Sequence, residues 1–114
     1  MDIAAEQFSP TLIVTVDNGV ASVEGIEHAK SLGIEVVVTD HHLPGDVLPD
    51  AVAIINPNLK GSDFAAMNLA GVGVMFYTLI AIRAELSRLD DPYARAPLAD
   101  LLDLVAIGLS LIHI

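Results

Sequence analysis

Two short runs of β-branched residues with a helical segment between them most constrain how this chain can fold. The first run, LIVTVD at 12–17, shows no polar alternation, which is typical of a strand buried on both faces of a parallel sheet. The second run, IEVVVT at 34–39, predicts another buried strand. Residues 20–32 between them place apolar side chains at near-helical spacing, and Gly33 is a common helix terminator. This order predicts a βαβ unit and an α/β fold with a parallel sheet.

The rest of the chain adds a third strand and two helices to this pattern. The run AVAIIN at 51–56 predicts a strand that stops at Pro57, and residues 57–68 predict irregular structure. A long helix is expected at 71–89, mostly apolar in its first half and charged in its second. A last helix is expected at 97–107, with a proline at its first position. The 114 residues suit one domain.

The composition indicates a cytoplasmic protein without a membrane span. There are no cysteines, which excludes disulfides and thiolate zinc sites and makes the cytosol the natural compartment. The N-terminal residues show neither the basic nor the apolar region of a signal peptide. The apolar run at 72–82 has eleven residues, whereas a membrane span needs about 20.

The charge balance is strongly acidic, with fifteen Asp and Glu against five Lys and Arg and a formal net charge of −10. Taken alone, this balance argues against nucleic-acid binding, because phosphate contacts require Lys and Arg. It fits a site that gathers carboxylates around cations. A soluble acidic surface without further function is an equally simple interpretation.

Acidic and imidazole side chains stand where the two predicted strands end. Asp17 ends the first strand, and Asp40 and His41 end the second. The carboxyl ends of parallel strands meet at one edge of the sheet, where ligands gather, and neighbouring strands are only about 5 Å apart. Carboxylate and imidazole together suit Mn²⁺, Fe²⁺ or Zn²⁺, whereas carboxylates alone suit Mg²⁺. Asp40 could orient a ligating histidine through its other ring nitrogen.

Each of these features also has a structural interpretation. The DNG sequence at 17–19 is a common turn, and two adjacent histidines can belong to a simple loop. Gly71 and Gly73, before the long helix, could let backbone amides approach a phosphate or could allow close packing of the helix. They match no dinucleotide or P-loop fingerprint. We expect His28 to lie on the surface, and we assign no role to His113.

Five segments together resemble a known family. In order along the chain they are VTVDNG, VVVTDHHLPG, AIINPN, LAGVGVMFY and LLDLVAIG, which span residues 12–108. The set is similar to the DHH phosphoesterase superfamily and, within it, to the RecJ-type 5′→3′ exonucleases that act on single-stranded DNA. The resemblance implies a Rossmann-like DHH domain with flanking helices, incomplete at both ends.

The resemblance also implies roles for individual residues. Asp17 would bridge two divalent cations, Mn²⁺ or Mg²⁺, and His41 would ligate one of them. Asp40 would support the ligand, and His42 would face the substrate phosphate. The glycines at 71 and 73 match a segment near the substrate. The implied reaction is phosphodiester hydrolysis by a metal-bound hydroxide, with both metals stabilising the phosphoryl group.

This chain departs from the family pattern near both ends. Family members have an earlier strand ending in Asp-x-Asp, which has no counterpart before Asp17, and an aspartate ligand that would fall at Ile112. We therefore expect a leader at 1–11, a partial DHH domain at 12–108, and a tail at 109–114 that is not native to the fold. With an incomplete two-metal site, the chain by itself is expected to be inactive, and single-stranded DNA would be bound through the complete enzyme.

Two other functions fit part of the pattern. The chain could belong to a DHH phosphoesterase of small substrates such as pyrophosphate, cyclic dinucleotides or short oligonucleotides. It could also be a non-catalytic α/β binding domain in which Asp17 and Asp40 are only acidic strand ends. Binding of Mn²⁺ through Asp17 and His41 would distinguish either enzyme from the binding domain.

Overall fold

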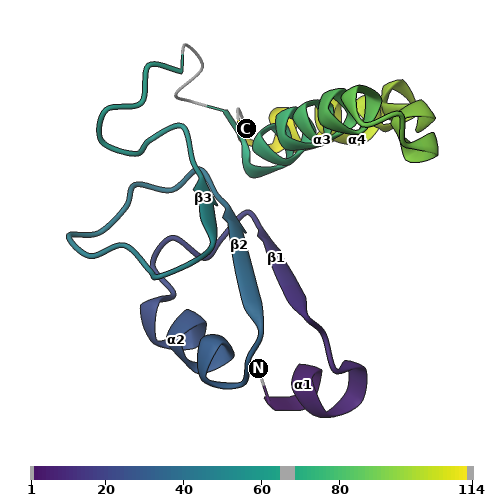
Figure 1. Ribbon diagram of the computed structural model, residues 1–114. Helices are drawn as coiled ribbons and strands as arrows, with labels where there is room; N and C mark the ends of the chain where they lie inside the picture. The colour runs from purple at the N-terminus through teal and green to yellow at the C-terminus, as the bar shows by residue number, and fades with distance from the viewer. Residues whose placement is uncertain (1, 65–68, 113–114) are drawn as a thin grey trace.

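The fold is a small parallel sheet with helices at its side and beyond its carboxyl edge (Figure 1). The computed structural model describes residues 2–64 and 69–112. The elements in chain order are α1 (Asp2–Phe8), β1 (Leu12–Val16), α2 (Val23–Ser31), β2 (Glu35–Thr39), β3 (Ala53–Ile55), α3 (Gly71–Arg88), two 3₁₀ turns (Pro92–Arg95 and Leu98–Leu101) and α4 (Leu102–Ile112). The predicted α/β class with a parallel sheet is confirmed.

The three strands pair in the order β1-β2-β3, and both pairings are parallel. Val14 pairs with Val37, which in turn pairs with Ala53. The ladder continues past the strand ends, because the Asp17 N–H donates to the Thr39 carbonyl at 3.0 Å and the Asp40 N–H donates to the Ile55 carbonyl at 3.0 Å. The backbone at both acidic strand ends is therefore fixed by the sheet itself.

An aliphatic core forms where α2 packs on one face of the sheet. Its buried members are Ile26, Ala29, Ile34, Val36 and Val38. Ile13 of β1 and Ile54 of β3 pack against this cluster from the neighbouring strands. Burial of such side chains stabilises by about 1.5–3 kcal/mol each, so this cluster holds the βαβ unit together.

The prediction that the first strand is buried on both faces is wrong. Leu12, Val14 and Val16 are 46%, 45% and 47% exposed. β1 lies at the edge of the three-stranded sheet, and side chains alternate between faces along a strand. Only the face that carries Ile13 meets the core under α2, so the alternate apolar side chains of β1 remain accessible.

The segment expected to be a leader contains helix α1. The side chain of Asp2 in its first turn pairs with the His28 imidazole of α2 at 2.6 Å. Hydrogen bonding and charge from His28 lower the pKa of Asp2. None of the residues described in α1 is buried. His28 is exposed, as predicted.

The two C-terminal helices lie side by side above the carboxyl edge of the sheet (Figure 1). α3 matches the predicted bounds to within one residue. The last helix begins with a 3₁₀ turn at Leu98–Leu101, and α4 continues through Gly108 to Ile112, so the predicted end near residue 107 is wrong. A Cβ on Gly108 would lie 2.3 Å from Cγ1 of Val72, so this glycine serves the close crossing of α4 and α3 rather than helix termination.

The loop after β3 is irregular over its described residues 57–64, as predicted, and residues 65–68 of that prediction lie outside the described part. Among the described helices, none combines the length and the apolar composition that crossing a membrane requires.

Candidate metal centre

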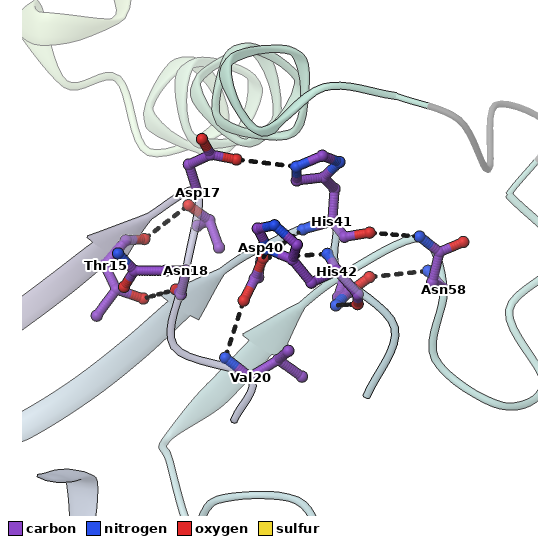
Figure 2. Close-up of polar contacts among 10 residues, drawn as sticks. Thr15, Asp17, Asn18, Val20, Asp40, His41, His42 and Asn58 are labelled. Atoms are coloured by element: carbon purple, nitrogen blue, oxygen red, sulfur yellow. Dashed lines mark hydrogen bonds and ion pairs between the residues drawn. The ribbon is translucent and has the colours of Figure 1, made fainter. Parts of the chain in front are cut away.

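Asp17 stands on a tight turn that follows β1. Its backbone has a left-handed φ of 65°, a conformation that aspartate tolerates better than most residues, and Gly19 follows with a φ of 116°. Thr15 Oγ1 donates to the Asn18 carbonyl at 2.7 Å and closes the turn (Figure 2). A Cβ on Gly19 would lie 2.6 Å from Thr15 Oγ1, so only glycine fits this position. The DNG sequence therefore forms a turn, and that turn places the carboxylate of Asp17 above the sheet edge.

Asp40 lies at the base of the site with only 1% of its surface exposed. Its Oδ2 accepts a hydrogen bond from the Val20 N–H at 2.9 Å. Its Oδ1 accepts from the N–H groups of His41 at 2.7 Å and His42 at 3.1 Å, and from the His42 ring at 2.7 Å. One carboxylate thus joins the loop after β1 to the loop after β2 (Figure 2).

The environment of Asp40 favours its charged form. Burial by itself raises the pKa of this carboxyl, but hydrogen bonds from Val20, His42 and His41 together outweigh that effect and hold the pKa below its usual value. Asp40 is therefore an anion that is fully engaged by its own loops. Its two oxygens face backbone amides and an imidazole. Asp40 therefore supports the loops that carry the exposed side chains of Asp17 and His42.

His41 and His42 complete a cluster with Asp17. The His41 Nε2 lies 3.0 Å from Asp17 Oδ1, and the two imidazole centroids are 4.5 Å apart. Each of Asp17, His41 and His42 offers one ligand atom, and these atoms lie within 4.8 Å of one another. Figure 2 shows the Asp17 carboxylate and the His41 ring facing each other beneath α3. A carboxylate with two imidazoles fits a divalent transition-metal ion.

His42 was predicted to face the substrate and not to be a ligand, whereas the geometry groups it with Asp17 and His41. Its Nδ1 is engaged by Asp40, so the Nε2 is the nitrogen left to face an ion or a phosphate. The His42 side chain is 59% exposed and that of Asp17 is 60% exposed, so a solute can reach both.

The glycine pair at the start of α3 is buried, and each member has a close neighbour. A Cβ on Gly71 would lie 2.0 Å from Asp17 Oδ1, and one on Gly73 would lie 2.5 Å from Cδ1 of Leu69. The missing side chain of Gly71 lets the N-terminus of α3 rest against the Asp17 carboxylate, and the positive end of a helix favours an anion there. Close packing thus accounts for both glycines, and contact with a substrate phosphate stays a prediction.

Sequence reasoning missed two asparagines at this site. Asn56 and Asn58 follow β3, and their amide groups donate to the carbonyls of His42 and His41. The available signal was the INPN sequence directly after the predicted third strand. The last histidine of the sequence analysis, His113, lies outside the described residues.

The fold and this site together define an α/β domain with a candidate divalent-metal centre at the carboxyl edge of a parallel sheet. The family described as "DHH family, N-terminal domain" matches residues 2–109. The chain therefore belongs to the DHH family, and the resemblance inferred from its motifs is confirmed.

Relatives and solved structures agree with this assignment. The chain is 59% identical over 101 residues to the single-stranded-DNA-specific exonuclease RecJ of Salmonella typhimurium, covering 85% of this chain and 18% of that protein. It is 44% identical over 98 residues to RecJ of Bacillus subtilis, covering 86% of this chain and 11% of that protein. It thus spans less than a fifth of the length of these relatives.

Two structures of RecJ bound to manganese share the fold. One is 32% identical with a TM-score of 0.69 and covers 95% of this chain and 26% of that chain. The other, from Thermus thermophilus, is 31% identical with a TM-score of 0.63 and covers 86% of this chain and 14% of that chain.

We predict that Gly71→Ala weakens Mn²⁺ binding by about tenfold, the scale typical of residues that support a metal ligand. The added methyl would displace the Asp17 carboxylate from His41. Gly25→Ala meets nothing within 4 Å, so this variant should bind Mn²⁺ like the wild type. Titration of the Mn²⁺ electron paramagnetic resonance signal measures this, and equal affinity of Gly71→Ala and Gly25→Ala would contradict it.

We predict that Asp40→Asn lowers the free energy of unfolding at pH 7 by about 3 kcal/mol, because charged hydrogen bonds in a buried site are lost. Since the folded-state pKa of Asp40 is lowered, its contribution is complete above the unfolded-state pKa of about 3.9. That contribution is lost as the pH falls through the folded-state pKa.

Urea unfolding followed by circular dichroism, without metal and from pH 7 down to pH 2, measures this difference. Asp91→Asn is the matched control, because Asp91 accepts one backbone hydrogen bond at an exposed helix cap. A difference between wild type and Asp40→Asn that stays constant with pH would show that the charge of Asp40 contributes nothing.

Proposed function

We propose that this chain forms the metal-binding part of a RecJ-type exonuclease that hydrolyses phosphodiester bonds of single-stranded DNA in DNA repair and recombination. The observation that supports this most is the cluster of Asp17, His41 and His42, whose ligand atoms lie within 4.8 Å at the ends of two strands. The 59% identity to a single-stranded-DNA-specific exonuclease supports phosphodiester hydrolysis as the reaction of the whole protein.

The proposed metal is Mn²⁺, with Mg²⁺ as the alternative. Both solved RecJ structures are described as manganese complexes, and a mixed carboxylate and imidazole set suits Mn²⁺ better than Mg²⁺. Asp17 would bridge two cations, and His41 would ligate one. The donors of this cluster cannot fill the coordination of two cations, so further ligands would come from outside it.

When bound, a pair of cations would activate water and stabilise negative charge on the phosphoryl group. The residues of the chain position the reactants. Asp40 engages the His42 ring through Nδ1. The other ring nitrogen, Nε2, would then face a substrate phosphate. The left-handed turn at Asp17 and the packing of Gly71 fix the carboxylate that the cations would share. Gly71 and Gly73 would line the substrate side of α3.

The acidic charge of the chain limits what it does by itself. With five Lys and Arg against fifteen Asp and Glu, it offers little for a DNA backbone, which binds through basic contacts. In this proposal the DNA-binding surface belongs to the remainder of a longer protein, and residues 12–108 supply the DHH part of the metal centre.

The first prediction of this proposal concerns activity. The 114-residue chain alone should release essentially no nucleotides from single-stranded DNA with Mn²⁺, because the donors of Asp17, His41 and His42 cannot fill the coordination of two cations. A chimera in which residues 12–108 replace the matching segment of Salmonella typhimurium RecJ should release nucleotides from 5′-labelled single strands. Asp17→Ala in this chimera should lower the rate by at least about a hundredfold, the upper limit typical of residues that only support a ligand.

Substrate choice in the same chimera separates the alternatives. Turnover of pyrophosphate or short oligonucleotides in preference to long single strands would favour a small-substrate phosphoesterase. A folded chimera without activity on any phosphate ester would contradict the proposed function.

The second prediction concerns the division of labour among the three clustered residues. Asp17→Ala should cost the most Mn²⁺ affinity, since a bridging ligand serves both cations. His41→Ala should lower affinity and be partly rescued by high Mn²⁺. His42→Ala should reduce turnover of the chimera more than affinity. Calorimetric titration of each variant decides, with the exposed and remote His28→Ala as the control. Equal loss of affinity in all three would refute this assignment.

A further inference from the structure

Strand β3 contributes none of the clustered ligand atoms, and the sequence Asn56-Pro57-Asn58 directly follows it, beside the two histidines. We infer that Asn56 and Asn58 are positioning residues that hold the His41–His42 dipeptide in the orientation the metal centre needs. This inference rests on the proposed function, because its consequence is a change in metal binding.

The side-chain amides of both asparagines reach back to the loop after β2. Asn56 Nδ2 donates to the His42 carbonyl at 2.9 Å. Asn58 Nδ2 donates to the His41 carbonyl at 2.5 Å (Figure 2). The two asparagines are also joined, because the Asn58 N–H donates to Asn56 Oδ1 at 2.9 Å. Asn56 is only 6% exposed, so its bonds form away from competing water.

These bonds complement those of Asp40. Asp40 accepts hydrogen bonds from the N–H groups of His41 and His42, and the asparagines donate hydrogen bonds to the carbonyl groups of the same two residues. All four backbone polar groups of the dipeptide are thus held by side chains. This frame fixes the backbone from which both imidazoles extend, although the dipeptide lies outside the paired part of β2.

The chemistry of the side chain explains why an amide is needed at position 56. The group must donate to the His42 carbonyl and also accept from the Asn58 N–H. An aspartate has no hydrogen to donate and would face a carbonyl with negative charge, and an alanine would leave both partners unsatisfied. Pro57 between them is buried and has a fixed φ, which suits an asparagine turn of this kind.

The test compares Asn58→Ala and Asn56→Asp with the wild-type chain. Ser31→Ala is the matched control, because Ser31 Oγ also donates to a backbone carbonyl, that of His28, on the far side of the domain. Two quantities are measured: Mn²⁺ affinity by paramagnetic resonance, and amide hydrogen exchange at His41 and His42. Amides in α2 and α3, such as Ile26 and Val74, report on the fold as a whole.

We expect each asparagine variant to lose about tenfold in Mn²⁺ affinity. The His41 and His42 amides should exchange at least about tenfold faster, while Ile26 and Val74 keep wild-type exchange. If the asparagines served only general stability, their substitution would instead raise the exchange rates of all these amides together. If Asn56→Asp does not fold, Asn58→Ala decides, since Asn58 is only partly buried.

The inference would be overturned if the asparagine variants matched Ser31→Ala in Mn²⁺ affinity and in exchange of the two histidine amides. The proposed metal centre would not be affected by that result. Absence of Mn²⁺ binding by the wild-type chain would overturn the proposed function instead. In that case the exchange of the two histidine amides alone decides whether the asparagines hold the dipeptide.

Discussion

The buried carboxylate of Asp40 is the interaction on which the candidate site depends. It accepts backbone hydrogen bonds from the loops after β1 and β2, so neither loop can move without breaking charged hydrogen bonds in a buried position. It also accepts a hydrogen bond from Nδ1 of the His42 ring. An acid at this position therefore joins two loops and orients an imidazole at the same time, which accounts for an aspartate directly before two histidines.

The parallel register explains why three short segments of sequence meet at this edge of the sheet. Each strand contributes the residues that directly follow it: Asp17 after β1, the DHH sequence after β2, and Asn56 after β3. Backbone hydrogen bonds of the ladder reach Asp17 and Asp40 themselves, so the sheet holds the first residues of both loops. The aliphatic core under α2 is thus the support of a polar site that lies beyond the sheet.

The sequence predicted the parts of this arrangement that arise from local pattern. The β-branched runs predicted the strands, and the polar residues at their ends predicted which side chains would meet. Exposure was not predictable in the same way, because an apolar run does not reveal whether both faces of its strand are covered. β1 meets the core with the face that carries Ile13, and its alternate valines remain exposed on the other face. The continuation of α4 through Gly108 was missed for a related reason. This glycine is needed for close packing against Val72 of α3, and its own sequence neighbours do not reveal that contact.

The distribution of exposure within the site separates the residues that organise from those that would bind. Asp40 and Asn56 are buried, and every hydrogen bond they make is to the protein itself. Asp17 and His42 are largely exposed and hold ligand atoms toward one another. Because the buried frame is ordered when the chain folds, an ion would meet side chains whose conformational freedom is already reduced, which favours binding. Gly71 adds a constraint from outside the frame, since any side chain there would push the Asp17 carboxylate away from His41. The candidate metal centre would therefore be sensitive to the packing of α3, an element that contributes none of the clustered ligand atoms.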